Sequence, residues 1–217
     1  MTFVSAPAPA ASAVGPTHLL YLHGFRSSPA SAKATRVMGW LRSHRPDVVA
    51  WCPQLPPSPA QAMAQVDRRL ADWARNLPEG PQGLAGRLAV IGSSLGGFYA
   101  THVAELTGCR AVLLNPAVDP ARDLARHIGE QTAWHSDERF FFEPRFVDEL
   151  RSLTHSRCSH PQRMMAVIAT GDEVLDWREM RDRYADCVLR IVAGSDHALS
   201  DFDDHLGAVL AFLGLTS

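Results

Sequence analysis

The sequence predicts a three-layer α/β/α fold, in which helices cover both faces of a mostly parallel sheet of about six strands. Short apolar runs recur along the chain, at residues 18–22, 48–52, 88–91, 111–114, 164–169 and 188–193. Each run is almost continuously apolar, which is typical of strands buried on both faces of a parallel sheet. Patterns of helical period lie between the runs, and right-handed crossovers place such helices on both sides of the sheet.

Length and composition favour one soluble globular domain. The chain has 217 residues, of which 46% are hydrophobic and 20% are charged. Its formal net charge of -2 lacks the basic excess that nucleic acids attract, so nucleic acid is not an expected partner. No apolar run approaches the ~18 residues of a membrane span, and the N-terminus lacks the charged start of a signal peptide. We therefore expect a cytoplasmic protein without a membrane span.

Residues 1–16 are predicted to be a mobile arm, and residues 17–217 to be the single domain. The arm is rich in alanine, proline and serine, and it holds too few large apolar side chains to offset the entropy of ordering. The four cysteines lie far apart without a C-x-x-C pair, at positions 52, 109, 158 and 187. This spacing favours buried reduced thiols over a zinc site or a disulfide framework.

Two of the predicted helices begin at a Ser-Pro pair. Ser28-Pro29 and Ser58-Pro59 each offer an N-cap followed by proline at the first helical position. Apolar residues at helical spacing follow each pair, namely Ala30, Ala34, Val37 and Leu41 after the first and Met63, Val66, Leu70, Trp73 and Leu77 after the second. Further helices are predicted over residues 95–106 and along an apolar stripe formed by Leu206, Val209, Leu210 and Leu213.

Residues 119–160 interrupt the alternation of strands and helices. Roughly 50 residues separate two predicted strands here, and connections of this length are usually lids or carry helices of their own. We predict a small helical cap over a site. Trp134 and Phe140–Phe142 are expected to form its core or an apolar wall for an acyl chain.

Residues 92–96 match the G-x-S-x-G motif, with Ser94 at its centre. The motif lies between a predicted strand and a predicted helix, which is the context it requires. In such a turn the central residue has a strained backbone, and the two glycines let the strand and the helix approach each other. Ser94 is therefore the candidate nucleophile, and Ser93 is expected to face away. The alternative is a simple Ser/Gly turn, because the motif also arises by chance.

A nucleophilic serine needs a base, which an acid in turn orients. In this fold the acid and then the histidine follow the serine along the chain. His197 follows the last predicted strand and is the expected base, and Asp172 follows the strand before it and is the expected acid. Asp119 and Asp176 remain alternatives for the acid. Asp196 is expected to point away from the site.

Acyl transfer also requires two N–H donors for the developing oxyanion. One expected donor is the backbone amide of Leu95, and the second is that of Phe25 in the loop after the first strand. Gly24 permits the sharp turn that this loop needs. We interpret His23 as structural, and Arg26 either contacts an anionic group of the substrate or is simply solvated.

The remaining patterns predict neither a metal nor another cofactor. Asp201, Asp203, Asp204 and His205 could hold a metal, but acidic residues in the first turn of a helix, after a possible cap at Ser200, are better explained by its dipole. The chain has no G-x-G-x-x-G after the first strand and no G-x-x-x-x-G-K-[ST], which are the usual signals of nucleotide binding.

A set of longer motifs carries a family resemblance: YLHGFRSSPASAKA, PQLPP, GSSLGGFYAT, NPAV, TGDEVLDW and HALSDF. In this order they resemble the YqiA-like esterases, a small family of the α/β-hydrolase superfamily, over nearly the whole chain after the arm. The resemblance implies a compact hydrolase with a reduced cap that acts on carboxylic esters or acyl thioesters, with Ser94, Asp172 and His197 as nucleophile, acid and base. The sequence departs from the family pattern in two places. Residues Gly194–His197 differ from the glycine and asparagine that are expected before the histidine, and the N-terminal arm is longer than the family needs.

Two other functions are compatible with the same residues. An acyltransferase would use the same triad with an alcohol or thiol in place of water. A binding or scaffold protein would retain the fold without activity, although each triad position holds a competent residue. The expected partner is a small-molecule acyl ester or thioester.

Overall fold

The computed structural model describes residues 15–133 and 137–216. Most of the predicted arm, residues 1–14, and Trp134 lie outside the described residues. The described residues form a parallel sheet in the order β2-β1-β3-β4-β7-β8. Its strands are β1 (His18–Leu22), β2 (Val49–Trp51), β3 (Leu88–Ser93), β4 (Arg110–Leu114), β7 (Met164–Ala169) and β8 (Val188–Val192). The predicted fold class is confirmed.

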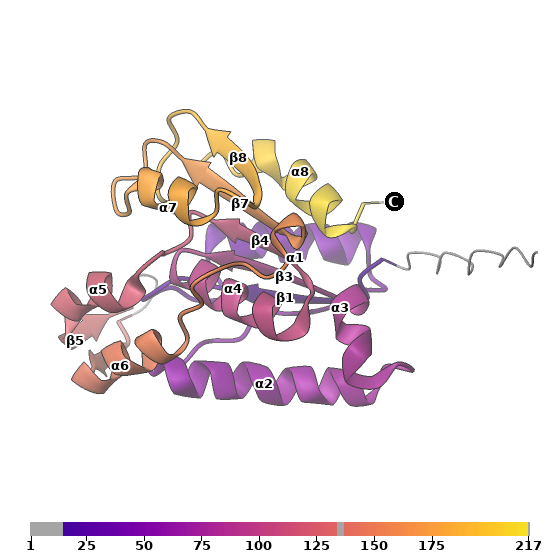
Figure 1. The fold of residues 1–217 in the computed structure, drawn as a ribbon, viewed down its shortest axis with the longest axis horizontal. Coiled ribbons are helices and arrows are strands. Elements are labelled where there is room, and N and C mark those ends of the chain that lie inside the picture. The colour runs from indigo at the N-terminus through magenta and orange to yellow at the C-terminus, as the bar shows by residue number, and fades with distance from the viewer. Residues whose placement is uncertain (1–14, 134–136, 217) are drawn as a thin grey trace, which may run out of the picture.

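Helices cover both faces of this sheet (Figure 1). One face packs against α1 (Ala32–His44) and α8 (Asp203–Leu213), and the other against α2 (Pro59–Arg75), α4 (Leu95–Thr107) and α7 (Trp177–Arg183). Leu19 and Tyr21 of β1 belong to the first core, whereas Leu20 and Leu22 belong to the second, and all four are fully buried. This alternation between two apolar layers explains why the strands read as continuous apolar runs. The short α3 (Leu84–Arg87) follows a 3₁₀ turn, Gly80–Gly83, and leads into β3.

The two Ser-Pro pairs behave differently. The predicted start of α2 is correct, since Ser58 is its N-cap and the Ser58 Oγ accepts a hydrogen bond from the Gln61 amide at 3.2 Å. The predicted helix start at Ser28-Pro29 is wrong, because α1 begins at Ala32. Ser28 instead closes a turn, in which its Oγ accepts from the Ala30 amide and its carbonyl from the Ser31 amide. Such local hydrogen bonds of serine compete with helix formation.

The connection from β4 to β7 holds a helix, a hairpin and a second helix. These are α5 (Pro120–Leu124), the antiparallel strands β5 (Gly129–Thr132) and β6 (Arg139–Phe142), and α6 (Pro144–Ser152), with 3₁₀ turns at Ala125–His127 and Pro161–Arg163. Figure 1 shows α5, β5 and α6 gathered at the end of the molecule away from the C-terminus. The hairpin was not predicted, because strands this short give little periodicity.

Aromatic and polar contacts join this connection to the body of the protein. Phe142 is buried, and its ring packs edge-on against Phe25 at 5.3 Å between centroids. The carboxylate of Glu149 on α6 accepts hydrogen bonds from the Ser58 hydroxyl at 2.6 Å and the Ala60 amide at 3.0 Å. Glu149 therefore helps to satisfy the free N–H groups at the start of α2.

All four cysteines are free, with Cys109 and Cys187 buried and Cys52 and Cys158 half-buried. Across the described residues, no helix combines the length and the apolar character that crossing a membrane requires.

Candidate active site

Ser94 occupies a sharp turn between β3 and α4. Its φ of 56° and ψ of -120° lie outside the regions that non-glycine residues ordinarily adopt. The flanking glycines have no room for a side chain. A Cβ on Gly92 would lie 2.0 Å from the carbonyl oxygen of Gly96, and one on Gly96 would lie 2.0 Å from that of Leu22. The motif therefore brings strand and helix into backbone contact, as the sequence pattern predicts.

Ser94, His197 and Asp172 form a hydrogen-bonded series. The Oγ of Ser94 lies 3.1 Å from the Nε2 of His197, whose Nδ1 lies 2.7 Å from an oxygen of Asp172. The Asp172 side chain is fully buried, and its other oxygen accepts hydrogen bonds from the amides of Val174 and Leu175, both at 2.8 Å. Because the carboxylate accepts the Nδ1 proton, the Nε2 of a neutral imidazole is left to accept the proton of the serine.

The two alternative acids have other partners. Asp119 is the N-cap of α5 and accepts a hydrogen bond from the Arg122 amide at 3.1 Å. Asp176 is the N-cap of α7 and accepts from the Arg178 amide at 2.9 Å. Of the three candidates weighed for the acid, the structure places Asp172 against the imidazole.

Asp196 faces its own loop, as expected. Its carboxylate accepts hydrogen bonds from the amide and the hydroxyl of Ser200, at 2.9 and 2.6 Å, and these bonds lower the pKa of Asp196. The hydroxyl of Ser200 is therefore bonded to Asp196 and not to the start of α8, so the predicted role of Ser200 as the cap of that helix is wrong. That helix begins at Asp203, and its N-cap position is Phe202, which has no capping side chain.

The residues that carry the two predicted oxyanion donors, Phe25 and Leu95, both lie next to the turn of Ser94. Leu95 is the first residue of α4, where N–H groups have no partner within the helix. A Cβ on Gly24 would lie 3.2 Å from the Cβ of Ser94, so the loop that carries Phe25 packs directly against the serine. Within residues 15–133 and 137–216, neither amide donates a hydrogen bond. Both are therefore available to an oxyanion.

His23 connects two loops and has a structural position. It is buried, its Nδ1 donates to the carbonyl of Gly24 at 3.0 Å, and its Nε2 accepts from the amide of Leu55 at 3.1 Å. Burial lowers the pKa of His23, which favours this neutral form. The histidine thus supports the loop that carries the Phe25 amide.

Arg26 has a contact that the sequence did not predict. Its Nε donates a 2.6 Å hydrogen bond to the carbonyl of Thr132 in β5. Arg26 therefore ties the loop after β1 to the hairpin.

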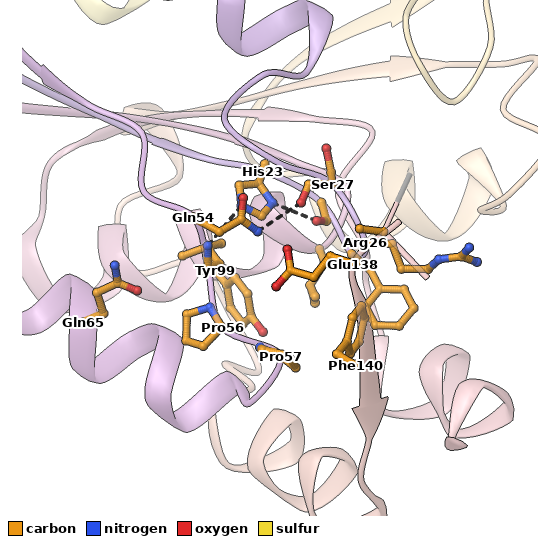
Figure 2. Close-up of a pocket in the computed structure, with 15 residues that line it drawn as sticks. His23, Arg26, Ser27, Gln54, Pro56, Pro57, Gln65, Tyr99, Glu138 and Phe140 are labelled. Carbon is orange, nitrogen blue, oxygen red and sulfur yellow. Dashed lines mark hydrogen bonds between the residues drawn. The ribbon is translucent and has the colours of Figure 1, made fainter. Parts of the chain in front are cut away.

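A pocket of about 430 Å³ lies next to the turn that carries Ser94 (Figure 2). Gly24 and Leu95 line it, whereas Ser94, His197 and Asp172 are not among its lining residues. This volume lies within the range of small-molecule sites. Figure 2 shows Tyr99, Pro56 and Pro57 on one side and Phe140 on the other, with Glu138 between them in this view. Further lining residues include Phe25 and Leu55, which are apolar, and Ser27, Gln54 and Gln65, which are polar. The walls combine apolar and aromatic side chains with polar and charged ones, and Arg26 and Glu138 are the charged residues among them.

Asp201 and Asp203, two of the acidic residues before and within α8, have partners in the protein. Asp201 accepts hydrogen bonds from the Ser195 hydroxyl at 2.5 Å and from the Nε2 of His205 at 3.2 Å. Asp203 pairs with Arg36 at 2.9 Å. No group of three or more His, Cys, Asp or Glu residues among the described positions is arranged to hold a metal ion.

Two residues that the sequence analysis did not single out contact the loop of His197. The side chain of Asn115 donates to two carbonyl groups of this loop, and that of Lys33 donates to a third. Both residues belong to the family-like motifs, NPAV and YLHGFRSSPASAKA. Their membership in these motifs, and the position of Asn115 directly after a strand, are the sequence features that could have identified the two residues.

The parallel sheet and the serine in the turn after β3 define the protein as one with the α/β-hydrolase fold. Est1E from Butyrivibrio proteoclasticus has the same fold, with a TM-score of 0.67 and 15% identity over 92% of this chain and 87% of that one. The mouse alpha/beta hydrolase domain-containing protein 10 also has this fold, with a TM-score of 0.65 and 17% identity over 93% of this chain and 90% of that one. The Paleococcus ferrophilus monoacylglycerol lipase has it too, with a TM-score of 0.65 and 14% identity over 93% of this chain and 96% of that one. At these identities the similarity concerns the fold.

Residues 18–214 match UPF0227, described as an uncharacterised protein family, and the chain belongs to this family. A UPF0227 protein of Serratia proteamaculans (strain 568) is 24% identical over 201 residues, which cover 89% of this chain and 97% of the relative. One from Yersinia pseudotuberculosis serotype IB (strain PB1/+) is 25% identical over 199 residues, with the same coverage. The family resemblance seen in the motifs is confirmed.

Proposed function

We propose that the protein is a serine hydrolase that cleaves carboxylic acyl esters or thioesters through an acyl-enzyme intermediate. The hydrogen-bonded series of Ser94, His197 and Asp172, on a strained turn beside a pocket, carries this proposal. Ser94 attacks the acyl carbonyl while His197 takes its proton and passes it to the leaving group. Water then attacks the acyl-enzyme with His197 again as the base. Asp172 holds the imidazole in the required tautomer and stabilises its cation.

The amides of Phe25 and Leu95 would bind the oxyanion of each tetrahedral intermediate. Their position beside Ser94 and their lack of partners among the described residues support this role. Donors that are already oriented toward the developing charge need no rearrangement during the reaction, which is why such groups contribute strongly to catalysis.

The pocket suits the apolar or aromatic part of a small ester. Phe25, Tyr99 and Phe140 supply aromatic surface, and the volume of about 430 Å³ sets a limit on the group that fits. Est1E, which shares the fold, has been crystallised with ferulic acid, an aromatic acid. A chain-length series of model esters and acyl thioesters would define the acyl group and the leaving group.

Labelling with a fluorophosphonate probe tests the proposal. The wild-type protein should form a covalent adduct at Ser94, and Ser94→Ala should form none. Ser93→Ala is the matched control, because it removes the neighbouring hydroxyl and should label like wild type. A wild-type protein that reacts no better than Ser94→Ala would contradict the hydrolase and favour a binding protein.

An acyltransferase is the second enzymatic candidate, since the same residues would carry it out with another acceptor. Analysis of the products with and without an added alcohol or thiol separates the two. A cytoplasmic location stays a prediction from the sequence.

A further inference from the structure

The loop that carries His197 is held from outside by the side chains of Asn115 and Lys33. The Nδ2 of Asn115 donates hydrogen bonds to the carbonyl groups of Asp196 and His197, at 3.0 and 3.1 Å. The ammonium of Lys33 donates to the carbonyl of Ala198. Consecutive carbonyl groups on both sides of the histidine therefore have side-chain donors.

Asn115 is itself fixed from several directions. It is fully buried directly after β4, its backbone amide donates to the carbonyl of Val167 at 2.9 Å, and its Oδ1 accepts from the amide of Ala169 at 2.8 Å. Because Oδ1 faces an N–H group, Nδ2 must face the histidine loop. Its φ of 42° is left-handed, a conformation that asparagine tolerates better than most residues. The orientation of its amide group is thus determined by the sheet.

The segment that contains Asn115 also holds the backbone of Ser94. The carbonyl of Leu114 accepts a hydrogen bond from the Ser94 amide at 3.0 Å, and the Ser94 carbonyl accepts one from the Ala117 amide at 3.1 Å. The backbones on the two sides of the Ser94–His197 contact are therefore both anchored to one short segment after β4. A shift of that segment, or of the loop relative to it, would change the distance between the reacting groups.

The histidine loop needs such external support. Ser195 and Leu199 have φ values of 54° and 49°, a region that is costly for these residues. A strained loop keeps one conformation only where its surroundings over-determine it. Glu173 adds one restraint, since its carboxylate accepts a hydrogen bond from the His197 amide at 2.9 Å.

Lys33, the single lysine of the chain, lies in the first turn of α1. Burial lowers the pKa of its ammonium to about 8, and the carboxylates of Asp196 and Asp172 counteract part of this shift. Lys33 is half-buried, and its hydrogen bond joins the first turn of α1 directly to the carbonyl that follows His197.

We infer that Asn115 and Lys33 are positioning residues that set the distance between the His197 imidazole and the Ser94 hydroxyl. The effect on activity rests on the proposed hydrolase function. A misplacement of ~1 Å near reacting groups can cost ~100-fold in rate. Loss of either set of donors should therefore lower kcat by about 10- to 100-fold. KM should stay near the wild-type value, since neither residue lines the pocket.

Two substitutions remove the donors with little change of shape. Lys33→Met keeps the length of the side chain, and Asn115→Asp replaces two N–H donors with an acceptor. Lys33→Arg retains a cationic donor and should recover part of kcat. Arg110→Met is the matched control, because Arg110 donates a 3.0 Å hydrogen bond to the carbonyl of Phe212 at the other end of β4. This control should have the kcat of wild type.

The experiment combines steady-state kinetics and fluorophosphonate labelling with NMR of the His197 ring, read from the imidazole proton shared with Asp172. The expected result is slower labelling and a changed or broadened ring signal in Lys33→Met and Asn115→Asp. Wild-type labelling and an unchanged signal in folded Lys33→Met would overturn the inference. If Asn115→Asp does not fold, Lys33→Met decides alone. If wild type does not react with the probe, the hydrolase proposal fails, and an unchanged ring signal in Lys33→Met would still refute the positioning role.

Discussion

The environment of Asp172 explains how a carboxylate can be buried at the centre of the site. One oxygen accepts two backbone N–H groups, and the other faces the imidazole, so both have partners that replace water. A buried polar group is costly only when such partners are missing. Asparagine at this position would keep the oxygen that faces the backbone but would present N–H to Nδ1 of His197. The imidazole would then be held in the wrong tautomer.

Asp172→Asn should lower kcat by about four orders of magnitude with little change in fold. Asp119→Asn and Asp176→Asn are matched controls, since each of these aspartates caps a helix and asparagine caps equally well. Both controls should keep wild-type kcat. Steady-state kinetics on one model ester measures all three variants. A large loss in either control, with Asp172→Asn active, would refute the assignment of the acid.

The turn between β3 and α4 depends on contacts between backbone atoms. Gly96 lies against the carbonyl of Leu22 in β1, so the start of α4 packs on two strands at once. The same contact places the loop after β1 beside Ser94. The hairpin of β5 and β6 then supports that loop through Phe142 and Arg26. Strand, helix and hairpin together define the surroundings of Ser94.

Gly96→Ala should lower the free energy of unfolding by about 3 kcal/mol, because its Cβ would overlap the backbone of β1 and force it to move. Gly207→Ala provides the comparison. Gly207 lies inside α8, an added Cβ there meets no atom within 4 Å, and alanine in a helix interior is favoured by up to ~1 kcal/mol. Urea denaturation followed by circular dichroism measures the free energy of unfolding of both variants and of wild type. Equal midpoints for Gly96→Ala and wild type would show that the turn tolerates a side chain.

The molecule as a whole gathers the residues of its candidate site at the carboxyl ends of several strands. Phe25, Ser94, Asn115, Asp172 and His197 follow β1, β3, β4, β7 and β8 in the order of the chain. Parallel strands joined by crossovers end at the same edge of the sheet, so distant parts of the sequence meet there. The folded molecule also buries His23 and half-buries His18 and His102, so the free energy of unfolding depends on pH.

The protein should lose stability as the pH falls below about 6.5. His18, His23 and His102 have pKa values lowered from 6.5, in each case mainly by burial. At mildly acidic pH the unfolded chain binds protons that the folded chain does not, so the free energy of unfolding decreases. Urea midpoints should be lower at about pH 5.5 than at about pH 7.5, and the difference should be smaller in His23→Gln. An unchanged or higher midpoint at the lower pH would contradict this.

The fold and the reactive residue types could be predicted because their signals are local. A strand buried on both faces must be apolar at consecutive positions, and the turn around Ser94 must have glycine on both sides. Strand ends then mark Asp172 and His197 as candidates. The same signals did not separate Asp172 from Asp119 and Asp176, because an aspartate that caps a helix and one that faces a histidine both follow strands and begin turns.

The tertiary structure alone decided which groups meet. The distances between Ser94, His197 and Asp172 depend on how β3, β7 and β8 align in the sheet, and no periodic pattern reports that alignment. The hairpin, the contacts of Arg26 and Glu149, and the support of the histidine loop by Asn115 and Lys33 join residues far apart in the chain. Local composition determines which elements form, whereas packing between those elements determines which side chains come within hydrogen-bonding distance.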